Sequence, residues 1–167
     1  MVAVVKLIDA ILFLFFIVIS VAAPLIDSQT CLPLCLFPNV LVDLKIWYTR
    51  KFDDYLIAQK PHFFVGMIWL ELLFQWPLVL LNIYGILGAK SWLNTTCLMY
   101  GVSVISTMVP LLSEMVWSGK ASDKLLMLYL PFIGLGVLAT LRGLLLHSAT
   151  TTPTDANRPP LARKKRA

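Results

Sequence analysis

Four apolar segments, each long enough for a helix to cross a lipid bilayer, limit what this chain can fold into. They cover about residues 7–26, 63–87, 93–112 and 125–146. A transmembrane helix needs about 20 consecutive, mainly apolar residues. Of the 167 residues, 59% are hydrophobic and 14% charged, whereas soluble domains average about 45–50% and about 25%. The sequence therefore predicts an all-α polytopic membrane protein built as a four-helix bundle.

The excess positive charge lies towards the C-terminal end, so the net charge of +5 does not indicate a nucleic-acid-binding protein. Arg142, Arg158 and the run 163–166 carry this excess. A basic segment after a hydrophobic domain is typical of a cytosolic tail. We predict a membrane domain over residues 1–147 and a disordered cytosolic tail over 148–167. Four crossings then place both termini in the cytosol.

Lys164 and Lys165 stand at the fourth and third positions from the end of the chain. This spacing matches the dilysine signal that retrieves membrane proteins to the endoplasmic reticulum. The alternative is a polybasic patch that binds anionic lipid. The N-terminal segment has its own alternative, a cleaved signal peptide, because residues 21–23 resemble a cleavage site. Asp9 and Pro24 argue against cleavage.

Residues 28–61 form the longest connection between apolar segments. Its hydrophobic residues recur at helical spacing, from Val40 to Tyr55, and charged residues fill the positions between them. This pattern predicts short amphipathic helices on the bilayer surface, in a lumenal loop. Cys31 and Cys35 are expected to be free thiols, because a helix holds an i, i+4 pair too far apart for a disulfide. No His or Cys cluster completes a metal site.

Glu71 is the most unusual residue in the membrane segments. It lies about 12 Å into an apolar run, where an ionised carboxylate costs roughly 2.5–3.5 kcal/mol on insertion scales. Gln75, Asn82 and Gly85 share its helix face. Lipid cannot satisfy such groups, so this face should turn into the bundle. A purely structural acid that ties two helices together is the alternative.

The third and fourth segments carry inward stripes of the same kind. One contains Tyr100 and Thr107, and the other contains Tyr129 and Phe132, followed by small residues that allow close helix packing. Together the stripes predict a mostly apolar cavity with a few polar groups that orient a ligand.

Two carboxylates, Asp27 and Glu71, are the strongest candidates for chemistry. Both fall on inward stripes near the same membrane face. Two acids in a poorly hydrated pocket push one pKa upward. We hypothesise that Glu71 is neutral and donates a hydrogen bond to ionised Asp27, which makes the cavity a receptor for a hydrophobic amine or a sterol hydroxyl. His62 and His147 are not placed to assist catalysis.

The order and spacing of several motifs resemble the sigma-2 receptor family of EXPERA-domain membrane proteins. The resemblance runs over about residues 11–146 and rests on the following residues and motifs: Asp27, Trp47-Tyr48, Phe52, Asp54, Glu71-Leu-Leu-Phe-Gln75-Trp-Pro77, Ser106-Thr107-Met-Val-Pro110-Leu-Leu112 and Tyr129-Leu-Pro131-Phe132.

This resemblance implies a homodimer of the endoplasmic-reticulum membrane that binds sterols and cationic amphiphiles and requires no cofactor. It also implies a role in cholesterol handling, partly with the Niemann–Pick type C cholesterol transporter. Asp27 would pair with a ligand amine, Glu71 would bond to Asp27, and the remaining pocket residues would be Phe52, Gln75, Tyr100, Thr107, Tyr129 and Phe132. At Phe132 the family often has Tyr.

Two other functions fit the same residues. Emopamil-binding sterol isomerases share the fold and place an acid and a base about the sterol, which Asp27 and Glu71 could supply. The isomerases use a histidine within the spans, and neither histidine of this chain is so placed. A structural lipid or protein chaperone, whose polar stripes only join helices, is the other alternative.

Overall fold

The computed structural model describes the backbone of residues 2–150 and the side chains of residues 3–144, and this part of the chain contains helices and no strands. The main helices are α1 (Val2–Leu25), α2 (Asn39–Phe52), α3 (Tyr55–Gln59), α4 (His62–Leu70), α5 (Trp76–Leu87), α6 (Leu93–Trp117) and α7 (Asp123–Thr150). Two 3-10 turns, Asp27–Thr30 and Leu34–Leu36, follow α1, and a π-helical turn, Glu71–Gln75, joins α4 to α5.

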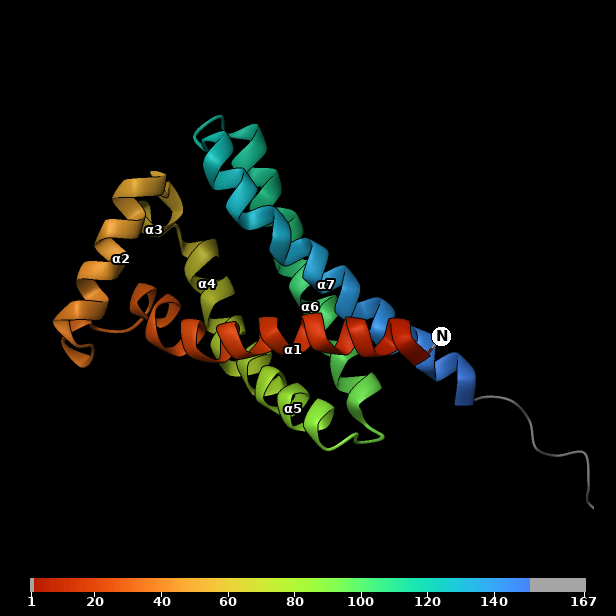
Figure 1. The fold of residues 1–167 in the computed structure, drawn as a ribbon. Coiled ribbons are helices and arrows are strands. Elements are labelled where there is room, and N and C mark those ends of the chain that lie inside the picture. Colours follow the sequence, from red (N-terminus) through yellow and green to blue (C-terminus); the bar gives the residue numbers. More distant parts are fainter. Residues whose placement is uncertain (1, 151–167) are drawn as a thin grey trace, which may run out of the picture.

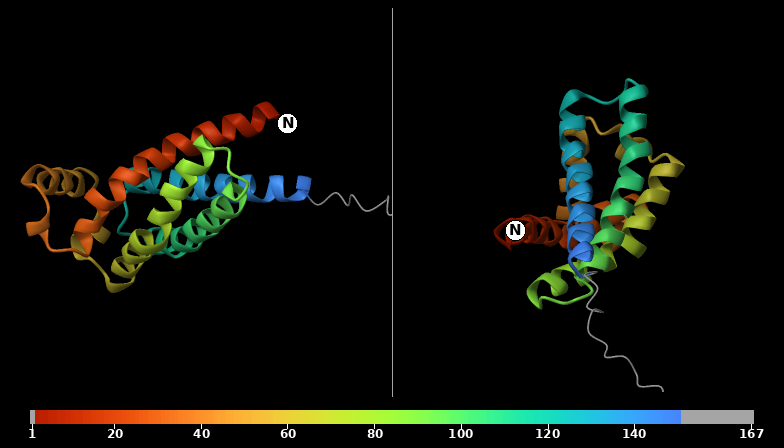
Figure 2. Two further views of the ribbon diagram at one scale, coloured as in Figure 1. Left: turned by 90° about the horizontal axis from the view of Figure 1, so that it is seen from below. Right: turned by 90° about the vertical axis from the view of Figure 1, so that its right-hand side faces the viewer.

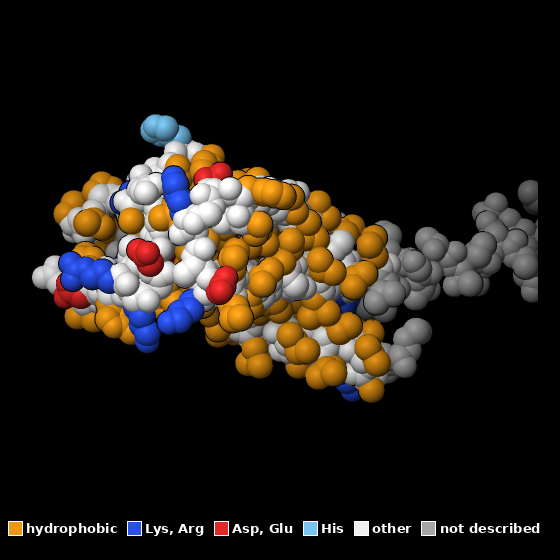
Figure 3. Space-filling view, turned by 90° about the horizontal axis from the view of Figure 1, so that it is seen from above, with side chains coloured by type: hydrophobic (Ala, Val, Ile, Leu, Met, Phe, Trp, Pro, Cys, Tyr) orange, Lys and Arg blue, Asp and Glu red, His pale blue; other side chains and the backbone are white. Residues whose placement is uncertain are grey.

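Four helical segments are long and apolar enough to span a membrane, which confirms the predicted all-α polytopic class. They cover Ala3–Thr30, His62–Leu87, Leu93–Trp117 and Asp123–Leu144. The third runs beyond its predicted end at residue 112, because polar residues ended the apolar run without ending the helix. It stops just before Gly119, whose φ of 65° suits glycine. In Figure 3, hydrophobic side chains cover most of the visible surface, and most of the charged ones gather at one end.

Helices α6 and α7 pack side by side as an antiparallel pair along most of their length (Figures 1 and 2). Small residues make this close packing possible, as the sequence predicted. A Cβ atom on Gly101 of α6 would lie only 2.6 Å from the carbonyl oxygen of Gly136 in α7. One on Gly143 would lie 2.7 Å from the Asn94 carbonyl oxygen. The two backbones are therefore in direct contact.

Helix α1 crosses the other helices, and its N-terminal end lies beside the C-terminal half of α7 (Figure 1). There Arg142 is buried: its Nε donates to Asp9 Oδ1 at 2.5 Å and its Nη1 to Asn94 Oδ1 at 2.7 Å. Arg142 counts in the sequence as part of the basic excess towards the C-terminal end, but its charge is paired with Asp9 inside the bundle. Arg142 lies inside the bundle because an ion pair with Asp9 offsets the cost of removing its charge from water.

The connection between the first two spans forms helices α2 and α3, so the predicted amphipathic helices are confirmed. Val40, Leu44 and Trp47 expose hydrophobic side chains. Lys45 departs from the pattern, because the sequence placed it on the polar face and the structure buries it. Helix α7 continues to Thr150, into the first residues of the predicted tail. Residues 151–167, including Lys164 and Lys165, lie outside the described residues.

Candidate functional site

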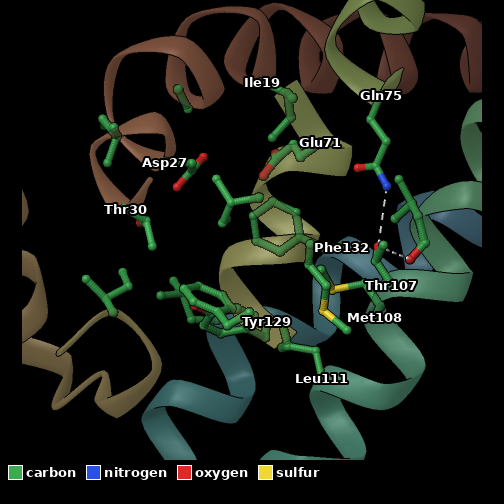
Figure 4. Close-up of a pocket in the computed structure, with 18 of the residues that line it drawn as sticks. Ile19, Asp27, Thr30, Glu71, Gln75, Thr107, Met108, Leu111, Tyr129 and Phe132 are labelled. Carbon is green, nitrogen blue, oxygen red and sulfur yellow. Dashed lines mark hydrogen bonds between the residues drawn. The ribbon is translucent and has the colours of Figure 1, made fainter. Parts of the chain in front are cut away.

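A cavity of about 290 Å³ lies in the bundle, lined by the end of α1 and the turn after it, α4 with the π turn, α6 and α7, and by Tyr48 of α2 and Ile57 of α3 (Figure 4). Most of its wall is apolar: Ile19, Ile68, Val104, Met108 and Leu111 are among the lining residues. A few polar side chains interrupt this wall. A volume near 300 Å³ and such a lining are typical of a small-molecule site.

Asp27 and Glu71 both line this cavity, as predicted. Asp27 begins the 3-10 turn after α1, and Glu71 begins the π turn after α4. Figure 4 shows their carboxylates pointing towards one another across the cavity. Among the described residues, however, neither carboxylate has a hydrogen bond, so the hypothesised bond from Glu71 to Asp27 is not present in this structure. Both acids are open to a ligand.

The π turn explains how Glu71 comes to face the cavity. Pro77 has no backbone N–H, and its ring would clash with the carbonyl group four residues earlier in an α-helix. The chain widens instead, and the N–H of Trp76 bonds to the carbonyl oxygen of Glu71. Such π bulges occur often at functional sites. The indole of Trp76 also donates to the Ser20 carbonyl oxygen at 3.0 Å, which joins the turn to α1.

Gln75, at the end of the π turn, is buried and reaches α6. Its Nε2 donates to Ser103 Oγ at 3.0 Å. It also donates to Thr107 Oγ1 at 3.4 Å (Figure 4). Asn82 and Gly85, which share the predicted stripe, are buried but belong to the contact with α6, where Asn82 accepts from the Cys97 thiol. Of the four residues on this stripe, Glu71 and Gln75 line the cavity, whereas Asn82 and Gly85 pack against α6.

Seven of the eight predicted site residues line the cavity; Phe52 does not. The ring of Phe52 packs against Tyr48, with 5.0 Å between ring centroids, and Tyr48 occupies the cavity wall in its place. One turn of α2 separates the two residues, and spacing alone could not say which one faces inward. Burial raises the pKa of the Tyr48 phenol, which keeps its hydroxyl protonated as a hydrogen-bond donor.

Asp54 is a functional candidate that the spacing analysis did not identify as a site residue. It is fully buried behind the cavity wall. Its Oδ1 accepts from the N–H groups of Leu56 and Ile57, both at 3.1 Å, and so caps α3. Its Oδ2 accepts from the hydroxyl of Tyr129 at 2.8 Å. Asp54 therefore holds Tyr129 in the cavity wall. The sequence signal for its capping role is an Asp directly before a short apolar run, which is typical of a helix N-cap.

Lys45 is the second residue that the sequence analysis missed. Its Nζ donates to Thr30 Oγ1 at 2.7 Å and to the carbonyl oxygen of Ile26 at 3.0 Å. Burial lowers the pKa of this lysine from about 10.5 to about 8, against the opposing influence of Asp27. No signal in one sequence separates a buried lysine from the solvated lysines on the same helix.

No group of three or more His, Cys, Asp or Glu side chains could hold a metal ion within the described part of the chain. Cys31 and Cys35 are both free thiols, as expected.

Comparison with known proteins places these residues in a family context. The family model of EXPERA (expanded EBP superfamily) matches residues 40–143. This range includes Glu71, Gln75 and Tyr129 but not Asp27. The chain is 33% identical over 99 residues to "Sigma intracellular receptor 2" of Homo sapiens and of Macaca fascicularis, which covers 58% of this chain and 56% of each relative.

A protein of the same name from Xenopus tropicalis is 28% identical over 113 residues, or 67% of this chain and 66% of the relative. The chain thus spans a little over half the length of the human and macaque relatives that it matches. The family resemblance indicated by the motifs is confirmed.

Proposed function

The chain belongs to the EXPERA family, and from this premise we propose that it is an intracellular membrane receptor for sterols and cationic amphiphiles. The ligand would enter the cavity with its apolar body against α4, α6 and α7. Its hydroxyl or amino group would reach the two carboxylates. The receptor would serve sterol or cholesterol homeostasis or trafficking.

One observation supports this proposal above the others: two unpaired carboxylates, on Asp27 and Glu71, face a largely apolar cavity within the bundle. Ionisable groups at such depth are expensive and are usually functional. A polar ligand group can give them the hydrogen bonds that they lack here. Tyr48 and Thr107 add further polar contacts on the wall.

The location and partners follow from the family resemblance and the tail sequence. We propose residence in the endoplasmic-reticulum membrane with both termini in the cytosol. A homodimer and a partnership with the Niemann–Pick type C cholesterol transporter are the proposed assemblies.

The same pair of facing acids favours one alternative, a sterol isomerase that protonates one side of a ring double bond and removes a proton from the other. His62 supplies no third group, since it does not line the cavity, and the side chain of His147 lies outside the described residues. Incubation of the purified protein with a Δ8-sterol tests this alternative. Isomerised sterol above the level of a protein-free control would favour the enzyme.

Sterol binding to the purified full chain in lipid nanodiscs tests the receptor proposal. Dehydroergosterol is the probe, read by energy transfer from the protein tryptophans. Ala22→Phe would fill the cavity, because Ala22 lines it, whereas the matched Ala10→Phe places the same ring on the exposed side of α1. We expect Ala22→Phe to weaken binding by more than about tenfold, as overfilling a packed site costs about 1–3 kcal/mol. Equal affinity for both variants would contradict the proposal.

A further inference from the structure

A buried positive charge stands beside the acid that is proposed to receive the ligand. Lys45 is only 6% exposed, and its ammonium group is held by the carbonyl oxygen of Ile26 and the hydroxyl of Thr30. Ile26 directly precedes Asp27, and Thr30 ends the 3-10 turn that Asp27 begins. The turn that presents the carboxylate to the cavity therefore also binds the lysine.

This lysine is not neutralised by direct contact. Within the described residues, the ion pair closer than 4 Å is Arg142 with Asp9, so Lys45 has no carboxylate in contact. Both groups that hold its Nζ are uncharged. Asp27 stabilises its charged form by Coulombic attraction from a greater distance. The positive charge is thus available to act on whatever approaches Asp27.

Other charges near Lys45 do not replace its influence. Asp54 accepts three hydrogen bonds, two of them from the N-terminal turn of α3, and these donors already compensate its charge. Lys60 is exposed, and water and salt screen it. Lys45 is the buried cation of this group, where the low polarisability of the surroundings strengthens its field.

We propose that Lys45 is a specificity-determining residue that acts through Asp27, disfavours cationic ligands, and directs the cavity towards neutral lipids that carry a hydroxyl group. This inference rests on the proposed function and narrows its ligand class. A cation at Asp27 meets repulsion from Lys45. A hydroxyl donates to the carboxylate without adding a charge, so the lysine leaves its binding unaffected.

The test compares two ligands of equal chain length on the full chain in nanodiscs. Dodecyltrimethylammonium carries a permanent charge, and 1-dodecanol is neutral; each displaces bound dehydroergosterol. Lys45→Met removes the charge, and Lys45→Gln removes it while retaining a donor for Thr30. Lys51→Met is the matched control: Lys51 lies on the exposed side of the same helix, with its Nζ 4.5 Å from the centre of the Trp47 ring.

We expect both Lys45 variants to bind the ammonium ligand about tenfold tighter, since tenfold is about 1.4 kcal/mol, the repulsion between unit charges about 12 Å apart at an effective dielectric constant near 20. Binding of 1-dodecanol and of the sterol should stay within about twofold of the wild type, and Lys51→Met should change neither, because that surface charge is screened. An unchanged ammonium affinity in both Lys45 variants would overturn the inference. So would an equal gain for the alcohol.

Failure of the proposed function would look different. If dehydroergosterol does not bind to the wild-type chain at all, the receptor proposal is refuted, and this inference falls with it. If the sterol binds but Lys45 does not discriminate between the two competitors, only this inference is refuted.

Discussion

The bundle contains two groups of buried charges, one at each end, and they are built differently. Near the end of α7, Arg142 donates to both carboxylate oxygens of Asp9 and to the side-chain oxygen of Asn94. Around the cavity, Asp27 and Glu71 have no bonded partner in the structure. The Arg142 group is hydrogen-bonded within itself, whereas Asp27 and Glu71 face a cavity.

This difference separates structural charges from candidate functional ones. A closed ion pair inside a membrane helix bundle joins helices, here α1 to α7. Carboxylates that face a cavity do not stabilise the fold, because no hydrogen bond within the chain offsets the cost of removing them from water. Mutations should therefore change binding at one end and stability at the other.

Asp27→Asn should have the largest effect on ligand binding. Removing this charge should weaken binding of dodecyltrimethylammonium by on the order of a hundredfold, because one partner of a buried charge pair is lost. Binding of 1-dodecanol should fall much less. Competition against dehydroergosterol measures both affinities, with Asp43→Asn on the exposed side of α2 as control. An unchanged ammonium affinity would remove Asp27 from the site.

Arg142→Met should have the largest effect on stability. It leaves the Asp9 carboxylate without its buried partner and should cost about 3 kcal/mol of unfolding free energy. The double variant Asp9→Asn with Arg142→Met should recover much of this loss, because no unpaired charge remains. Unfolding in mixed detergent micelles measures the difference. Loss of sterol binding by a fully stable Arg142→Met variant would contradict a purely structural role.

Glu71→Gln should have a smaller effect on binding than Asp27→Asn. If Glu71 is neutral, an amide can replace it and still donate a hydrogen bond to Asp27 or to the ligand. We expect a loss of about three- to tenfold, the net contribution of one hydrogen bond. The same competition assay applies. A loss greater than that of Asp27→Asn would show that Glu71 carries the charge.

The smallest predicted effect is a pH dependence of stability caused by Lys45. Its pKa is about 8 in the folded chain and about 10.5 when unperturbed. Between these values the unfolded chain binds more protons, so the wild type should gain stability relative to Lys45→Met as the pH rises from 8 towards 10. Melting temperatures of both proteins at pH 7 and 9.5 test this. Parallel changes in the two proteins would show that the effect does not come from Lys45.

The membrane spans and seven of the eight site residues could be predicted because both depend on local pattern. Apolar length fixes a span, and a polar residue inside a span must face inward. Glu71 and Gln75 were found in this way, Asp27 was placed on the stripe of the first span at the membrane edge, and the family resemblance implied all three. The sequence does not show which polar residues meet a partner from a distant helix. The partner of Arg142 was therefore not predicted, because its pairing with Asp9 joins the two ends of the described chain.

The loop helices were less predictable than the spans. An amphipathic pattern shows that a helix lies on a surface. It does not show which residues between the polar and apolar faces are covered by another segment. Lys45 is buried by the turn after α1, and Tyr48 rather than Phe52 faces the cavity. Both facts depend on how the loop folds back over the bundle. The role of Asp54 could not be predicted for the same reason, since its partner Tyr129 lies in α7, far away in the sequence.

The glycine contacts between α6 and α7 determine which side of the cavity can change shape. Two backbones that touch at Gly101 and Gly143 cannot move closer, and sliding along one another would drive side chains into the opposite backbone. These helices therefore act as a rigid wall. If ligands of different width bind, we therefore expect the cavity to adjust on the side formed by α1 and the loop helices rather than between α6 and α7.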